Sequence, residues 1–417
     1  MKTYSEQLLT ASQKNDFSQN RILLRKALAH DDENTLAKLA ASLSDLGLTD
    51  MAQEIYRALL KKDPENGFYK VYLSEILLND GKDDEALSLL YDVQPDDDAY
   101  LASLLAAADY YEANGLVETA AAKLAEARQL APHEPAVIFG QAELAFENGD
   151  FQTALPLYRQ LAKKRRTMAE VSLTQRQIAC LANLGEYEQA AQLLRQDQDA
   201  IVSIDDRYQA GVILLAAGDT KQAIKYFDSV IRQSPDYVSV YPRLAVAYAR
   251  EHDQNNALQT ALTGLSYDQC NSRLYAQAAQ AAANLGQEKQ AEDLLTKGLK
   301  QEPDDNSLRL QLSNLFLHQG RDQDNVDLLA DLPDDDKEPQ VYWNLALSQL
   351  HLEKLAAARA NFLLAYPAYK NNPDFLKNFI QLLQAQGDQS NLKILLQDYL
   401  RLVPEDPDMQ DLLNRLQ

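Results

Sequence analysis

IDDRYQAGVILLAAGDTKQAIKYFDSVIRQSPDY, residues 204–237, holds two apolar stripes in succession. In the first half, Tyr208, Gly211, Leu214 and Leu215 follow one another at intervals of 3, 3 and 1 residues. This spacing places them on one face of an α-helix. A second stripe of helical spacing runs through residues 223–231. The stretch therefore predicts two consecutive helices, each with one apolar side.

Glycine and proline mark the ends of these two helices. Gly218 lies between the stripes, where a residue without a side chain readily adopts the left-handed backbone that closes a helix. Pro235 follows the second stripe, and proline cannot continue a helix. Residues 204–237 are thus predicted to form one helical hairpin.

One such hairpin cannot be stable alone. Fixing the backbone costs about 1–2 kcal/mol for each residue. Burial of a large side chain such as Phe227 returns about 1.5–3 kcal/mol, and an isolated hairpin buries few of them. The hairpin must therefore stack on further copies of itself.

Copies of the unit recur along nearly the whole chain. The turn glycine returns at intervals of 33 to 36 residues, mostly 34, and His252 and Glu353 stand at two of its places. Such a steady period is typical of a solenoid. The aligned glycines are Gly47, Gly81, Gly115, Gly149, Gly185, Gly218, Gly286, Gly320 and Gly387.

Five residues after each turn the chain favours a small side chain. A methyl group there lets the second helix lie close against the first, whereas a leucine would hold the two apart. The first unit departs from this pattern with Asn20, and the last with Leu392. The alanines at this place are Ala52, Ala86, Ala120, Ala154, Ala190, Ala223, Ala257, Ala291 and Ala358.

This combination of turn glycine, small residue, aromatic or aliphatic residue four positions later and closing proline resembles the tetratricopeptide repeat. The resemblance implies an all-α fold, an α-α superhelix in which about twelve hairpins form a right-handed solenoid. It covers residues 1–404, with residues 405–417 as a C-terminal capping helix. Loosely closed units predict bends near residues 95–100, 197–204 and 331–338. The whole is similar to long cytosolic tetratricopeptide proteins of bacteria.

The chain of 417 residues is acidic, with a formal net charge of −22 and a pI near 4.6. This charge repels nucleic-acid phosphates and anionic lipid surfaces, so basic or apolar protein partners are easier to accommodate. The alternative is that the acidity only keeps a Leu-rich and Ala-rich protein in solution. The start of the chain does not resemble a signal peptide and no apolar run is long enough to span a bilayer, so we expect a cytoplasmic protein without membrane insertion.

The sequence offers no pattern of catalysis. Its five histidines lie in separate units, and HExxH, GxSxG, P-loop and GxGxxG motifs are absent. Cys180 and Cys270 stand alone and are expected to be buried, so neither a metal nor another cofactor is predicted. We therefore expect a non-enzymatic protein.

In proteins that this chain resembles, the face beside the core stripe of each first helix lines a concave groove for a peptide or a partner's helix. In units three to five this face carries four acids, three phenylalanines and no base. It would suit a partner segment with Lys or Arg and apolar anchors, although a chain so rich in acids yields about two by composition alone. The predicted groove residues are Phe68, Val71, Glu75, Leu105, Asp109, Glu112, Phe139, Glu143 and Phe146.

Three further readings stay open. A peptide-sensing regulator and a homo-oligomeric scaffold are both compatible with stacked hairpins. The basic run from Lys163 to Arg166 could dock an acidic partner or pair with acids of its own chain. A clamp for chaperone C-terminal tails, known in this family, is rejected: Asn314 and Asn344 match its asparagines, but its cation places lack Lys and Arg.

Overall fold

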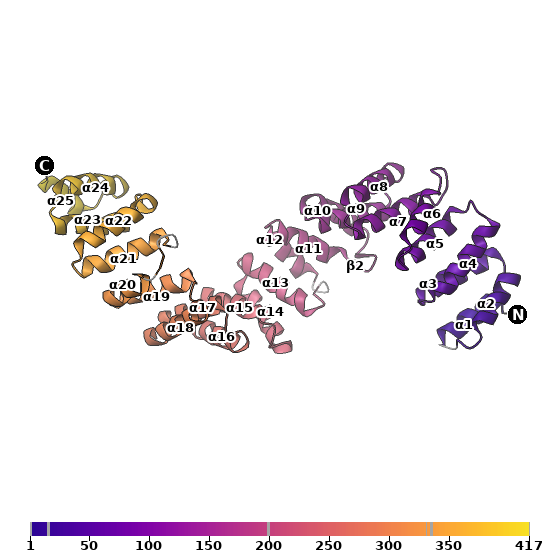
Figure 1. Ribbon diagram of the computed structural model, residues 1–417, viewed down its shortest axis with the longest axis horizontal. Coiled ribbons are helices and arrows are strands. Elements are labelled where there is room, and N and C mark those ends of the chain that lie inside the picture. Colours follow the sequence, from indigo (N-terminus) through magenta and orange to yellow (C-terminus); the bar gives the residue numbers. More distant parts are fainter. Residues whose placement is uncertain (1, 15–16, 198–200, 331, 334–336, 417) are drawn as a thin grey trace. The chain divides into compact units, whose positions relative to one another are not determined.

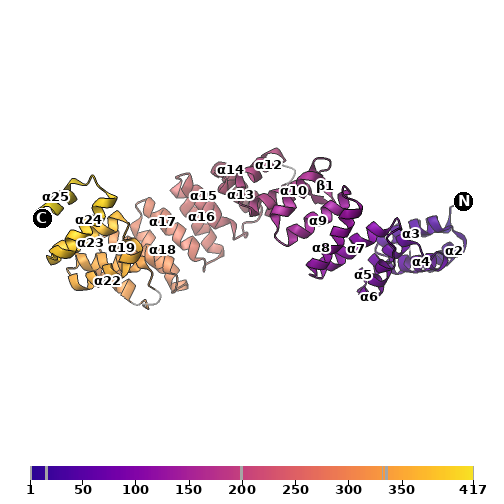
Figure 2. The same cartoon turned by 90° about the horizontal axis from the view of Figure 1, so that it is seen from above.

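The computed structural model describes residues 2–14, 17–197, 201–330, 332–333 and 337–416. It divides the chain into two compact units, Met1–Ala200 and Ile201–Gln417. Within each unit, helical hairpins stack in the order of the sequence (Figures 1 and 2). Two of the predicted bends, at 197–204 and 331–338, include residues 198–200, 331 and 334–336, which lie outside the described residues. All three bends remain predictions.

In the described part of the first unit, consecutive pairs of helices form six hairpins. The helices are α1 (Tyr4–Gln13), α2 (Asn20–His30), α3 (Glu33–Asp45), α4 (Thr49–Lys62), α5 (Gly67–Asn79), α6 (Asp83–Tyr91), α7 (Tyr100–Ala113), α8 (Val117–Leu130), α9 (Pro135–Glu147), α10 (Phe151–Ala162), α11 (Leu173–Asn183) and α12 (Tyr187–Gln196).

The second unit, over its described residues, contains six more pairs and one last helix. The helices are α13 (Ile204–Ala216), α14 (Thr220–Gln233), α15 (Val240–Arg250), α16 (Gln254–Tyr267), α17 (Ser272–Asn284), α18 (Glu288–Gln301), α19 (Asn306–His318), α20 (Asp322–Ala330), α21 (Pro339–His351), α22 (Leu355–Tyr369), α23 (Pro373–Gln386), α24 (Gln389–Leu402) and α25 (Pro407–Arg415).

The predicted fold class is confirmed, because the described chain is an α-solenoid of twelve hairpins followed by α25. Each first helix packs on the second helix of its hairpin, and most first helices also contact the first helix of the next hairpin in the same unit, as α5 contacts α7 and α17 contacts α19. Neighbouring hairpins within a unit therefore bury apolar faces against each other. A short exception is the antiparallel pair β1 (Thr167–Met168) and β2 (Val171–Ser172), which joins α10 to α11.

The small residues after the turns are buried where the sequence places them. Ala223 is fully buried, as are most alanines of this series. Asn20 is buried at the corresponding place in the first hairpin and donates from Nδ2 to Ser12 Oγ over 3.1 Å. Asn325 occupies it in the tenth hairpin, where it donates to Ser348 Oγ over 2.9 Å. In both asparagines the amide nitrogen is bonded while the buried Oδ1 has no hydrogen-bond partner among the described residues, so a polar residue at this place is only partly satisfied.

In the hairpin of α13 and α14, a glycine on the first helix also allows the two helices to lie close together. A Cβ atom added at Gly211 would lie 2.5 Å from a ring carbon of the fully buried Phe227. Such a separation is well inside van der Waals contact, so the ring occupies the space that a side chain would need. Gly211 therefore sets how closely α13 lies on Phe227 of α14.

The two cysteines differ in their surroundings. Cys180 is buried on α11, as the sequence predicts. Cys270 is exposed, so the prediction of burial is wrong there. The reason is that Cys270 lies in the connection between α16 and α17 and not on a helix stripe.

The turn between the two helices of a hairpin demands a left-handed backbone. Gly218 has φ of +83°, while His252 and Glu353, at the same place in their hairpins, have φ of +60° and +58°. A residue with a side chain pays about 1–2 kcal/mol for this conformation. The alignment of His252 and Glu353 with the turn glycines is therefore correct, and both carry backbone strain.

We expect His252→Gly to raise the free energy of unfolding by about 1 kcal/mol, because glycine removes the strain of the left-handed backbone. Urea denaturation of the wild type and the variant measures this difference, provided that the unfolding free energy of both depends equally steeply on the urea concentration. Gly218→Ala is the matched control and should lower the stability by a similar amount. Equal stability of His252→Gly and wild type would contradict the prediction.

Candidate functional site

An open hollow of about 690 Å³ lies between α5 and α7 in the first unit. These are the first helices of the third and fourth hairpins, and they contact each other along the stack. The hollow includes two of the predicted groove acids, one from each helix. Its lining residues are Glu75, Leu78, Asn79, Asp83, Ala106, Asp109, Tyr110, Ala113 and Asn114.

Glu75 and Asp109 are exposed to water on one side and surrounded by protein on the others. This partial desolvation raises the pKa of the Glu75 carboxyl, and the charge of Asp109 raises it further. Desolvation also raises the pKa of Asp109. Both carboxylates therefore carry their charge at a cost in free energy.

Glu112, one turn further along α7, extends this acidic surface. Its pKa is raised by desolvation and then by the charges of Asp109, Glu143 and Glu147. Among the residues that the structure describes, none of Glu75, Asp109 and Glu112 has an ion pair or a hydrogen bond to its carboxylate. We call these three residues the acidic strip.

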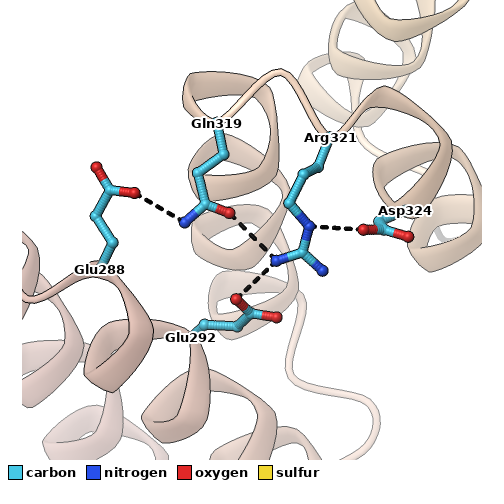
Figure 3. Close-up of polar contacts among 5 residues, drawn as sticks. All are labelled: Glu288, Glu292, Gln319, Arg321 and Asp324. Atoms are coloured by element: carbon cyan, nitrogen blue, oxygen red, sulfur yellow. Dashed lines mark hydrogen bonds and ion pairs between the residues drawn. The ribbon is translucent and has the colours of Figure 1, made fainter.

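At one junction between hairpins of the second unit, by contrast, the acids are neutralised. In the second unit, the Arg321 guanidinium contacts Glu292 at 2.7 Å and Asp324 at 2.6 Å (Figure 3). Gln319 joins the same cluster by accepting from Arg321 over 3.2 Å and donating to Glu288 over 3.0 Å. The acidic strip differs from this cluster because no cation of the described part of the chain pairs with it.

Glu143, the fourth predicted groove acid, is not part of the acidic strip. It accepts from Arg176 Nη2 over 2.5 Å and from Arg176 Nε over 3.1 Å. Tyr158 donates to the same carboxylate over 2.6 Å, and the Arg176 guanidinium lies 4.2 Å from the centre of the Phe146 ring. Glu143 and Phe146 are therefore occupied by contacts within the chain.

Arg176 is a functional neighbour that the sequence reasoning missed. It lies on α11, in the hairpin that follows units three to five, so it is not among the residues of the predicted groove face. It follows Glu143 by 33 residues, close to one repeat. A cation one repeat after an acid is thus the signal that could have revealed the pair.

Val71 is wrong as a groove residue. It is 2% exposed and packs in a core cluster with Leu90, Val93 and Ala99. The cause is the short helix α6, because the connection that follows it folds Val93 and Ala99 onto α5. Tyr72 takes its place on the surface, with 44% exposure.

Apolar side chains lie beside the acids on the same helix face. Phe68 is 43% exposed, and Phe68, Tyr72 and Glu75 follow one another at helical spacings of four and three residues. Leu105 on α7 and Phe139 on α9 are half-buried. The first unit thus presents aromatic and aliphatic side chains next to the unpaired carboxylates.

The asparagine pair of the second unit is part of the packing. Asn344 is 1% exposed, and its Nδ2 donates to Ser313 Oγ and to Asn314 Oδ1, each over 2.8 Å. Gln340 donates to Asn344 Oδ1 over 2.8 Å. These bonds hold α19 and α21 together and leave the amide of Asn344 without access to a ligand.

Comparison with known proteins identifies the repeats. Models described as YpiA-like tetratricopeptide repeats match residues 113–165, and their C-terminal counterpart matches 339–406. General tetratricopeptide-repeat models match residues 37–100, 207–237 and 276–339. The chain belongs to the tetratricopeptide-repeat family. This membership supports a role in protein binding rather than catalysis.

One relative is similar over most of the chain. The TPR repeat-containing protein YpiA of Bacillus subtilis (strain 168) is 27% identical over 390 residues, which cover 93% of this chain and 92% of YpiA. Solved structures show lower similarity. The APC/C hetero-tetramer Cut9-Hcn1 is 13% identical with a TM-score of 0.42, covering 99% of this chain and 96% of its own. PilF of Pseudomonas aeruginosa is 17% identical with a TM-score of 0.43, covering 51% and 97%.

Across the described residues, every helix is too short or too polar to traverse a lipid bilayer.

We expect Glu75→Gln and Asp109→Asn each to raise the melting temperature at pH 7. The folded pKa of each carboxyl lies above its unfolded value, so stability is lost as the pH rises through that interval. The gain in melting temperature should therefore shrink as the pH is lowered to about 4, where the carboxyl takes up a proton in the folded and in the unfolded state. Calorimetry across this range tests the prediction.

Asp411→Asn, on the exposed face of α25, is the control for the loss of one negative charge. A gain at Glu75 and Asp109 that stays the same at every pH would contradict the assignment of desolvated, mutually repelling carboxylates.

We expect Arg176→Ala to lower the free energy of unfolding by about 1–3 kcal/mol, because it leaves the partly buried Glu143 carboxylate without its charged partner. Arg159→Ala, which removes an exposed bond to Gln189, is the matched control and should change it by less than about 0.5 kcal/mol. Chemical denaturation compares the two, and equal effects would show that the Arg176 contact is no more than a surface pair.

Proposed function

We propose that this protein is a non-enzymatic scaffold whose hollow between α5 and α7 binds a segment of another protein, in which Lys or Arg alternates with apolar side chains. The observation that carries this proposal is the acidic strip: among the described residues, Glu75 and Asp109 line the hollow without a cation, and Glu112 lies one turn further along α7. A cytoplasmic location belongs to the same proposal.

The free energy of the acidic strip supports a cationic partner. Each carboxylate there is desolvated, and Glu75 and Glu112 are also repelled by Asp109. A lysine or arginine side chain placed in the hollow would relieve this repulsion. Because the carboxylates are already partly desolvated, most of the added desolvation cost would be that of the cation itself. Hydrogen bonds to charged groups contribute about 1.5–3 kcal/mol each.

The apolar neighbours supply the rest of the contact. Phe68 and Tyr72 are large, exposed and held on the rigid helix α5, so they lose little conformational entropy on binding. Burial of apolar side chains against them would add affinity that charge alone does not provide. A segment with both kinds of side chain therefore fits better than a purely basic one.

Peptide titration tests the proposal. A labelled peptide with alternating Lys and Leu should bind the full chain, and its affinity should fall at least about tenfold in Glu75→Lys/Asp109→Lys/Glu112→Lys, equivalent to about 1.4 kcal/mol. The same peptide with Glu in place of Lys should not bind. Fluorescence anisotropy at fixed ionic strength measures both.

The matched control is Asp293→Lys/Asp304→Lys/Asp411→Lys, which changes the net charge equally at exposed acids of the second unit. If the peptide affinity falls equally in both triple variants, the interaction depends on net charge only and the hollow is not the site.

A further inference from the structure

The connection between α10 and α11 carries the strongest positive charge in the described first unit. Lys163, Lys164, Arg165 and Arg166 are consecutive and all exposed. The antiparallel pair β1 and β2 follows them directly in the chain; β2 is labelled in Figure 1 and β1 in Figure 2. We call residues 163–172 the basic loop.

The cations of the basic loop are not used by the fold. Within the described chain, the side chains of Lys163, Lys164 and Arg166 make no hydrogen bond or ion pair, and Arg165 reaches only the Met168 sulfur at 3.5 Å. Elsewhere even the buried Lys70 is paired, with Asp92 at 2.6 Å. In a chain with 62 acids against 40 bases, a run of unpaired cations is unexpected.

The backbone of the basic loop is ordered by specific bonds. Thr167 pairs with Ser172 across the two strands, and Leu173 N donates to Arg166 O over 3.0 Å. Ala169 and Glu170, at the tip, have φ of +45° and +65°, although neither is glycine. A hairpin turn with two such residues costs free energy, and strain of this kind is retained where surrounding structure and function require it.

We propose that the basic loop of one copy docks in the hollow between α5 and α7 of a second copy. This inference rests on the function proposed for the hollow and names its partner. The complementarity is direct, because the basic loop has four consecutive cations, whereas Glu75 and Asp109 line the hollow and Glu112 lies one turn beyond it, and no cation of the described chain pairs with these carboxylates. Phosphate-bearing partners fit less well, since a net charge of −22 repels them.

The basic loop cannot serve its own hollow. The hollow is lined by the last residues of α5 and α7 and by Asp83 at the start of α6, so it lies at the edge of the unit where the hairpins turn. The basic loop joins two hairpins at the opposite edge, about 20 Å away along a helix of 13 residues such as α9. Docking therefore requires a second molecule.

Each copy carries both surfaces, so two copies can exchange loops in a two-fold dimer, or successive copies can associate head to tail. Both arrangements place the same cations on the same carboxylates. Both also predict that the mass in solution rises above the 46.7 kDa of one chain as the concentration increases.

Sedimentation equilibrium of the full chain tests this association. The wild type should associate, and Lys163→Glu/Lys164→Glu should weaken the association at least tenfold. Lys61→Glu/Lys62→Glu, an equal charge change at adjacent exposed lysines of α4, should behave like the wild type. Circular dichroism checks that all three chains fold.

Charge exchange makes the test specific. Glu75→Lys/Asp109→Lys should also prevent association, and a chain that combines it with Lys163→Glu/Lys164→Glu should associate again, because the two reversed surfaces are complementary. Salt dependence is less decisive, since screening also reduces the repulsion between two acidic chains.

The outcomes separate the two proposals. A wild type that stays monomeric while its hollow binds the Lys-Leu peptide overturns the docking of a second copy and leaves the proposed function intact. Association that neither reversal changes also overturns it. If the acidic strip variants bind the Lys-Leu peptide as tightly as the wild type, the proposed function itself is overturned.

Discussion

The close approach of the two helices in each hairpin is the constraint on which the rest of the structure depends. An alanine such as Ala223 lies fully buried five residues after the turn, and Gly211 leaves room for the Phe227 ring. Two helices that lie so near each other bury few of their apolar side chains between them, and the remaining apolar faces must be covered by the next hairpin. Stacking is therefore a consequence of packing within the hairpin, and it brings the first helices of successive hairpins side by side.

This arrangement also decides which charges meet. Where a cation of one hairpin lies opposite an acid of the next, the two pair, as Arg176 does with Glu143 and Arg321 with Glu292. Where hairpins contribute only acids to neighbouring positions, as at α5 and α7, the carboxylates remain unpaired; desolvation raises the pKa of all three, and the charge of Asp109 raises that of Glu75 and Glu112 further. The acidic strip and the basic loop are thus two places where the regular pairing between hairpins is absent. Both are consequently available to a partner.

The sequence allowed the fold, and the accessibility of some of the proposed groove residues, to be predicted for the same reason, namely that both follow from periodicity. Leu105, Asp109 and Glu112 are accessible as the helical spacing required. Val71 failed because an irregular connection after α6 covers it, and the repeat pattern contains no information about that connection. Glu143 and Phe146 are where the periodicity places them, but they are occupied by a residue from the next hairpin.

The sequence by itself determined the helical hairpins, their number and the turn positions, including the left-handed backbones of His252 and Glu353. These depend on local geometry, since side-chain spacing, the freedom of glycine and the restriction of proline act within a few residues. Only the tertiary structure decided which groove acids are free and which are neutralised, and that residues 167–172 form a strained strand pair. Those features depend on contacts between residues a full repeat apart or in connections of irregular length, where no local preference specifies the partner.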